Sequence, residues 1–141
     1  MEYMLMPLKR YADFQGRSRR KEYWMFILLQ IILFIVVGII AALLGGFSNV
    51  SAPNPTNPFS MLSGVTMGLF GILMLALIIP SIAVQVRRFH DQNRSGWFVL
   101  LGFVPYIGGL VVLIFMLLEG TKGPNRFGED PKGQNLQDVF S

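Results

Sequence analysis

The sequence predicts an all-α integral membrane protein, folded as a small helical bundle with two full transmembrane helices in one membrane domain, 1–141. Hydrophobic residues make up 52% of the chain and charged residues only 14%, whereas soluble domains carry about 25% charged residues. The basic residues flank long apolar runs, where phosphate headgroups are the nearest anions. Because cysteine is absent, disulfides, thiolate metal sites and cysteine nucleophiles are excluded.

The first 23 residues form a basic N-terminal segment, 1–23. Leu8, Tyr11 and Ala12 recur at helical spacing, and Pro7 suits a first helical turn because its missing N–H is not needed there. We therefore expect an N-terminal amphipathic helix in the cytoplasmic interface. A disordered basic tail is the alternative.

The run 24–44 is apolar throughout, with Gln30 as its one strongly polar side chain. At 1.5 Å per residue it reaches about 31 Å, which spans a hydrocarbon core of about 30 Å. This run is the first predicted transmembrane helix. The loop 45–60 that follows holds three prolines and no charged residue, which favours a connector on the external side.

The second predicted transmembrane helix covers 63–86 and contains Pro80. Gly64 and Gly68 are four residues apart, and Gly38 begins a similar series of small residues on the first helix. Such small residues let membrane helices approach closely. The alternative is that glycine is simply frequent in membrane helices.

A polar cytoplasmic motif, 87–96, separates this helix from a third apolar segment, 97–118. The third segment is broken at Pro105–Gly109, so it forms either a re-entrant hairpin or a single span. A hairpin would keep every Lys and Arg on the cytoplasmic side, including those of the turn-rich polar tail 119–141.

Several short motifs follow one another along nearly the whole chain. They are Phe-Gln-Gly-Arg (14–17), Arg-Lys-Glu-Tyr-Trp (20–24), Arg-Arg-Phe-His-Asp (87–91), Arg-Ser-Gly-Trp (94–97), Glu-Gly-Thr (119–121) and Asn-Arg-Phe-Gly-Glu-Asp-Pro (125–131). In this order the motifs resemble the DUF805 family of small bacterial inner-membrane proteins, and only the long, proline-rich first loop departs from it. The resemblance implies location and architecture, and it supplies no catalytic residues.

If the C-terminus is cytoplasmic, the polar motifs meet in one cap at the cytoplasmic end of the bundle. Its predicted lipid- or partner-binding residues are Arg17, Arg19, Arg20, Arg87, Arg88, His90, Asp91, Arg94, Trp97, Asn125 and Arg126. We expect the acids Glu22, Asp91, Glu129 and Asp130 to pair with these arginines. A single histidine without cysteine predicts no metal site, and the sequence predicts no cofactor.

The sequence therefore predicts a non-enzymatic, multi-pass protein of the bacterial cytoplasmic (inner) membrane with a cytoplasmic N-terminus. Its expected partners are the phospholipid bilayer, an anionic lipid, and a membrane protein or a second copy, but no nucleic acid. One alternative is an enzyme acting on a lipid-linked phosphate, with His90 beside the arginines. Another alternative is an oligomeric transport or channel subunit. It is weaker, because few polar groups that could line a pore lie within the apolar runs.

Overall fold

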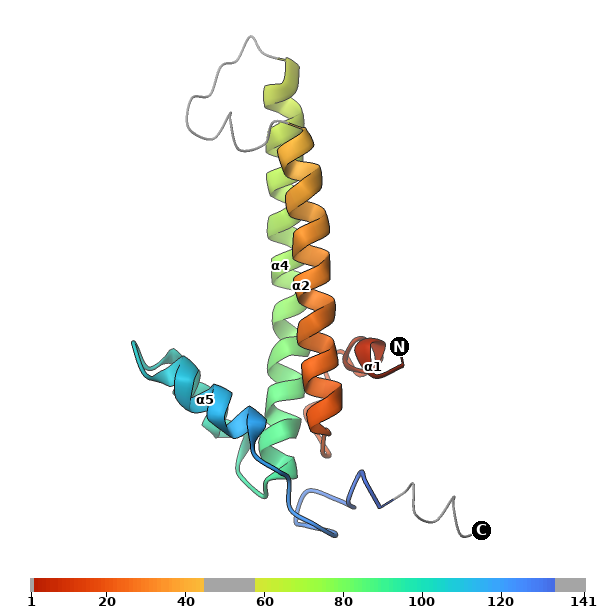
Figure 1. The fold of residues 1–141 in the computed structure, drawn as a ribbon, viewed down its shortest axis with the longest axis vertical. Coiled ribbons are helices and arrows are strands. Elements are labelled where there is room, and N and C mark those ends of the chain that lie inside the picture. The colour runs from red at the N-terminus through yellow and green to blue at the C-terminus, as the bar shows by residue number, and fades with distance from the viewer. Residues whose placement is uncertain (1, 45–57, 134–141) are drawn as a thin grey trace. The chain divides into compact units, whose positions relative to one another are not determined.

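The computed structural model describes residues 2–44 and 58–133, with side chains for 2–44 and 62–133. In chain order its elements are α1 (Glu2–Lys9), α2 (Arg20–Leu43), α4 (Pro58–Asp91), the 3-10 helix η1 (Gly96–Phe103) and α5 (Gly108–Leu117) (Figure 1). No strand occurs within these described residues, so the predicted all-α fold is confirmed. Most of the predicted external loop, 45–57, and the end of the tail, 134–141, lie outside the described residues.

Two of the described helices are long and apolar enough to cross a membrane, namely Arg20–Leu43 and Leu62–Asp91. Apart from Leu44, they contain the two predicted transmembrane runs, and they extend a few residues beyond them. The N-terminal helix α1 is shorter than the expected amphipathic helix. Beyond it, Asp13 accepts hydrogen bonds from the Arg10 side chain and the Gln15 N–H, which closes a turn instead of continuing the helix.

The chain divides into two compact units, and the helical residues described in the unit Leu28–Ile78 belong to α2 and α4 and carry no charge. Within it the two helices run antiparallel, and the rings of Phe34 and Phe70 meet at 5.7 Å between centroids. A Cβ atom added at Gly38, Gly64 or Gly68 would meet nothing within 4 Å. The predicted small-residue contact at these glycines is therefore wrong within this chain, because their missing side chains leave open space instead of a close helix approach.

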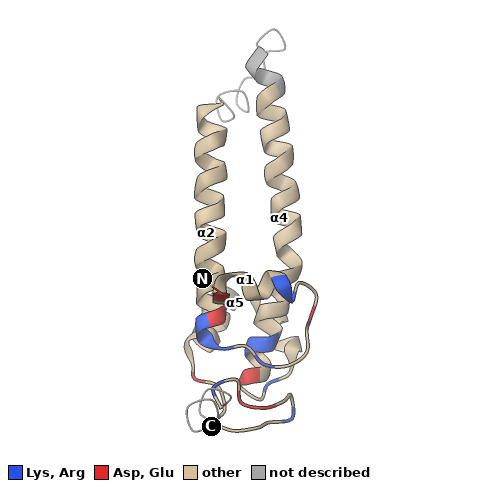
Figure 2. Cartoon of the chain, turned by 90° about the vertical axis from the view of Figure 1, so that its right-hand side faces the viewer, with Lys and Arg blue, Asp and Glu red and all other residues tan. Residues whose placement is uncertain are grey.

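The other unit combines Met1–Ile27 with Ile79–Ser141, and it holds every charged residue of the chain. In Figure 2 the charges on α2 and α4 are confined to the end of each helix that belongs to this unit. Its buried core consists of Phe26, Ala83, Val84, Phe89 and Met116, all between 0% and 1% exposed. The polar motifs therefore fold together with a small hydrophobic core of their own.

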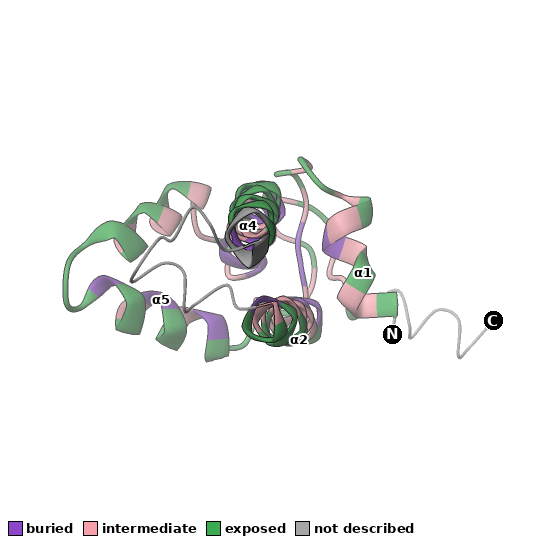
Figure 3. Cartoon of the chain, turned by 90° about the horizontal axis from the view of Figure 1, so that it is seen from above, coloured by how far each residue is buried: buried purple, intermediate pink, exposed green. Residues whose placement is uncertain are grey.

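The third apolar segment is broken as predicted, into η1 and α5 joined by a turn. The two helices pack against each other, with the rings of Phe98 and Phe115 at 6.2 Å. Gly108 makes the turn possible, because a Cβ atom there would lie 2.1 Å from the Leu101 carbonyl oxygen. The segment thus folds back on itself, and we call residues 96–117 the apolar hairpin. Most of its residues are exposed (Figure 3).

Candidate functional site

A buried carboxylate, Asp91 at the end of α4, organises the polar motifs. Its Oδ1 accepts a hydrogen bond of 3.0 Å from Arg17 Nε, and its Oδ2 accepts one from Arg88. The side chains of Arg17, Arg88 and Asp91 are 1%, 0% and 6% exposed. Two cations share one anion here, and the sequence expectation that Asp91 pairs with arginines of the predicted set agrees with this geometry.

The tail supplies the remaining acceptors for Arg17. The carbonyl oxygens of Gly123 and Thr121 lie 2.7 Å and 2.5 Å from its guanidinium nitrogens, and the Thr121 N–H donates to the Asp91 carbonyl at 2.8 Å. A Cβ atom at Gly120 would lie 1.9 Å from Asp91 Oδ2, so only glycine fits at that position. We call Arg17, Arg88, Asp91, Gly120 and Thr121 the Asp91 cluster.

Asn125 fixes the next turn of the tail onto the α4 motif. Its side-chain amide donates to the His90 carbonyl at 2.9 Å, and its Oδ1 accepts the Phe127 N–H at 2.9 Å. Asn125 and Gly128 also exchange two backbone hydrogen bonds of 3.0 Å. This turn stacks the Phe127 ring on the His90 ring, with 3.9 Å between centroids and 5° between planes.

Glu22 and Arg87 form a second buried pair, between α2 and α4. The distance from Arg87 Nη2 to Glu22 Oε1 is 3.4 Å, and the two side chains are 0% and 4% exposed. Glu129 and Asp130 do not continue this pattern. Asp130 accepts the backbone N–H groups of Gly123 and Lys132, and no arginine pairs with Glu129 among the described residues. The expected pairing of these two acids is therefore wrong, because backbone N–H groups of the turn, and not an arginine, bond to both oxygens of Asp130.

The other predicted residues lie at the edges of this arrangement. Arg20 pairs with Glu119 at 2.6 Å across the surface, and Arg126 donates to the Asn93 carbonyl at 3.3 Å. Arg94 lies over the Phe115 ring, 4.6 Å from its centroid, at the base of the apolar hairpin. Trp97 is 77% exposed on the hairpin itself. All eleven predicted residues thus belong to one unit, but they do not form one site.

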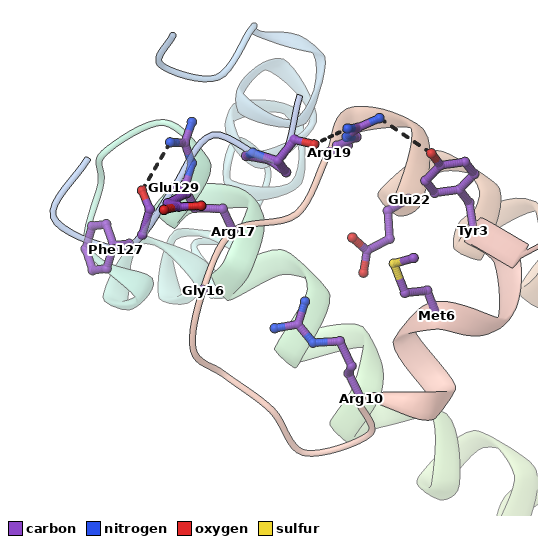
Figure 4. Close-up of a pocket in the computed structure, with 11 residues that line it drawn as sticks. Tyr3, Met6, Arg10, Gly16, Arg17, Arg19, Glu22, Phe127 and Glu129 are labelled. Atoms are coloured by element: carbon purple, nitrogen blue, oxygen red, sulfur yellow. Dashed lines mark hydrogen bonds between the residues drawn. The ribbon is translucent and has the colours of Figure 1, made fainter. Parts of the chain in front are cut away.

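A cavity of about 370 Å³ opens beside the Asp91 cluster. It is lined by Tyr3, Met6, Arg10, Gly16, Arg17, Arg19, Glu22, Phe127, Gly128, Glu129 and Pro131 (Figure 4). Arg19 donates to the Pro131 carbonyl and lies 3.5 Å from the Tyr3 hydroxyl. Arg10 donates to Asp13 at 2.8 Å and to the Gln15 carbonyl at 3.0 Å. We call this the arginine cavity.

Two acids in the turns beside this cavity, Asp13 and Asp130, are stabilised in their ionised forms. Burial alone would raise the pKa of Asp13, but the Arg10 side chain and the Gln15 N–H outweigh it and lower the pKa. Burial likewise opposes ionisation of Asp130, yet the N–H groups of Lys132 and Gly123 and the charge of Arg17 lower its pKa. Both carboxylates therefore stay charged and hold their turns in place.

Sequence reasoning missed four residues that this geometry requires, namely Tyr3, Arg10, Gly120 and Thr121. For Arg10, the presence of Asp13 three residues later was the available signal. Gly120 and Thr121 belong to the Glu-Gly-Thr motif, but nothing in their spacing indicates contact with Asp91.

Comparisons with known proteins agree with the predicted family and with an inner-membrane location. Residues 11–129 match the family model described as "Protein of unknown function (DUF805)". The chain is 42% identical to the inner membrane protein YhaH of Escherichia coli (strain K12) and 43% identical to its inner membrane protein YhaI. These two alignments cover 94% of this chain and 98% and 97% of the relatives.

A more distant relative is the uncharacterized protein YiiR of Escherichia coli (strain K12), which is 25% identical over 84% of this chain and 85% of its own length. No solved structure matches the chain. Because the family model covers the Asp91 cluster, both long apolar helices and the apolar hairpin, the chain is an inner-membrane protein that belongs to the DUF805 family.

Proposed function

We propose that this protein is a non-enzymatic, multi-pass protein of the inner membrane that binds an anionic lipid headgroup in the arginine cavity. The main observation behind this proposal is that three arginines, Arg10, Arg17 and Arg19, line one cavity together with two carboxylates. One of these carboxylates, Glu22, already has Arg87 as its ionic partner. The lining therefore favours an anion, and a headgroup phosphate is the anion nearest to a membrane protein.

The three arginines contribute unequally to this proposal. Arg17 is bonded through Nε, Nη1 and Nη2 to six acceptor atoms of the chain, so it supplies charge and no spare donor. Each guanidinium has five N–H donors. Arg19 uses part of this capacity for Pro131 and Tyr3, and Arg10 for Asp13 and Gln15. Arg10 and Arg19 are therefore the residues that we assign to the phosphate.

The distribution of charge supports a cytoplasmic location of the cavity. Arg17 and Arg20 of the N-terminal segment bond directly to Asp91 and to Glu119 of the tail, which supports one common side for all three polar segments. Basic residues mark the cytoplasmic side of bacterial membrane proteins. We therefore infer that both termini are cytoplasmic. Reporters fused after Ser141 and within loop 45–60 test this, and a C-terminal reporter that is active only outside the cytoplasm would contradict it.

The binding proposal is tested with the purified full-length protein in mild detergent. Native mass spectrometry compares the uptake of phosphatidylglycerol and phosphatidylcholine with identical acyl chains. We expect the wild type to prefer phosphatidylglycerol and Arg19→Ala to lose about tenfold of that preference, because a hydrogen bond to a charged group contributes about 1.5–3 kcal/mol. Arg19→Lys should restore it only in part, since an ammonium lacks the guanidinium fork.

The matched control is Lys122→Ala, which removes one exposed positive charge outside the cavity lining. It should keep the lipid preference of the wild type. Equal losses for Lys122→Ala and Arg19→Ala would reduce the effect to net charge and would overturn a specific cavity. A wild type without headgroup preference would leave a protein partner as the better assignment for this surface.

A further inference from the structure

The apolar hairpin, residues 96–117, has no polar face. From Gly96 to Leu117 the sequence contains no charged residue, and Trp97 and Tyr106 carry its only side-chain hydrogen-bonding groups. The bulky side chains of Trp97, Phe103 and Tyr106 are 77%, 78% and 104% exposed. A helix pair in contact with water needs a polar outer face, so the hairpin requires an apolar surrounding on its outward sides.

The two arms of the hairpin have nearly the same length. The eight residues of η1 reach about 16 Å and the ten residues of α5 about 15 Å, at about 2.0 Å and 1.5 Å rise per residue. Half of a hydrocarbon core of about 30 Å is also about 15 Å. The hairpin is therefore long enough to reach the middle of a bilayer and too short to cross it.

The turn at the tip keeps much of its backbone bonded. The N–H of Val104 donates to Leu101, that of Ile107 to Pro105, and that of Gly108 to Val104, while Pro105 has no N–H. Backbone groups without partners are costly in hydrocarbon. These bonds make the tip suited to a water-poor environment.

The open end of the hairpin is anchored to polar groups at both arms. Arg94, just before η1, lies over the rings of Phe98 and Phe115. At the other arm Arg20 donates to the Leu117 carbonyl at 3.1 Å, and Arg88 donates to the Leu118 carbonyl. Arginines of the same compact unit therefore contact both ends of the hairpin.

From these observations we propose that the apolar hairpin inserts among the lipid acyl chains of one leaflet and returns to the side from which it entered. Tyr106 then lies near mid-bilayer depth, and Trp97 lies beside the headgroups. Lipid acyl chains are the surroundings that fit the hairpin, because they can contact all of its outward faces equally. A second copy of the chain would cover one face and leave the opposite apolar face without cover. This proposal does not depend on headgroup binding in the arginine cavity.

The chain has no cysteine, so a single introduced cysteine is the only thiol of the protein that can react with a maleimide. Tyr106→Cys at the tip and Lys122→Cys in the tail are placed in the full-length protein and treated with a membrane-impermeant maleimide in spheroplasts and in inverted vesicles. We expect Lys122→Cys to react in the inverted vesicles only. We expect Tyr106→Cys to react in neither preparation and to react fully after detergent is added.

Two results would overturn the insertion. Reaction of Tyr106→Cys in spheroplasts would mean that the segment crosses the membrane, and reaction in inverted vesicles would mean that it lies on the surface. Nitroxide labels at Leu110→Cys on α5 and Leu100→Cys on η1, both exposed and on different arms of the hairpin, then identify the occupant. High oxygen collision rates at both sites support acyl chains. Dipolar broadening between labels with a low rate at one site would assign that face to a second copy instead.

Discussion

Arg17 and Arg19 are two residues apart, yet their surroundings give them different roles: Arg17 stabilises the fold, and Arg19 is available to bind a ligand. Arg17 is 6% exposed, and Asp91 and the tail carbonyls occupy its three nitrogens. Arg19 is half-buried and has two partners, one of them 3.5 Å away. The Asp91 cluster is thus internally complete, whereas the arginine cavity keeps unused donors. The same residue type stabilises the fold in one place and is available to a ligand in the other.

The largest effect is expected from Asp91→Ala. It leaves Arg17 and Arg88 buried without their shared carboxylate, and breaking a buried ion pair from one side costs about 3–5 kcal/mol. The free energy of unfolding, measured by denaturant titration in mild detergent, should fall by that amount. The control is Glu119→Ala, whose pair with Arg20 is exposed and contributes at most about 1 kcal/mol. Similar losses for the two variants would remove the distinction between a buried cluster and the surface.

A smaller loss is expected from Gly120→Ala, which tests the fit of the tail against Asp91. The added Cβ atom would lie 1.9 Å from Asp91 Oδ2, so the tail must move away, and overpacking of this kind costs about 1–3 kcal/mol. Gly109→Ala is the matched control, because its Cβ atom meets nothing within 4 Å. Thermal unfolding of both variants measures the difference. A Gly120→Ala protein as stable as Gly109→Ala would mean that the tail does not pack on Asp91.

The two long helices and the break in the third segment were predictable because each depends on the local run of residues. Length and hydropathy define a span, and a Pro and two Gly within a few residues define a break. The pairing of Asp91 with an arginine was also predictable in kind, since a buried acid needs a cation. Charge alone could not select Arg17 from its basic neighbours.

The rest of the site depends on backbone shape that no periodicity encodes. Carbonyl groups of Thr121 and Gly123 bind Arg17, and the tail presents them through a turn in which Gly123 has a φ of +77°. The residue types there predict turns but not their direction. The arginine cavity is assembled from α1, the segment before α2, the first turns of α2 and this tail, so its lining could not be derived from any one motif.

A pH-dependent effect on the tail is expected from Asp130. Its pKa in the folded protein lies below its ordinary value of 3.8, because bonds from Lys132 and Gly123 outweigh its burial. The stabilisation is therefore present above the unfolded pKa and is lost as the pH falls through the lower, folded pKa. The amide chemical shifts of Gly123 and Lys132, followed by NMR, should titrate with a midpoint below 3.8. A midpoint at or above 3.8, or an unchanged titration in Asp130→Asn, would contradict these bonds.

The smallest effect is expected from Arg126→Ala, which separates the arginine cavity from the wider set of cap residues. Arg126 is exposed, makes one bond of 3.3 Å to the Asn93 carbonyl, and does not line the cavity. Its removal should change the free energy of unfolding by no more than about 0.5 kcal/mol, as surface substitutions usually do. It should also keep the preference for phosphatidylglycerol that Arg19→Ala loses, measured by the same native mass spectrometry. If Arg126→Ala loses as much preference as Arg19→Ala, headgroups bind over the whole basic surface, and the contrast between bonded and available arginines fails.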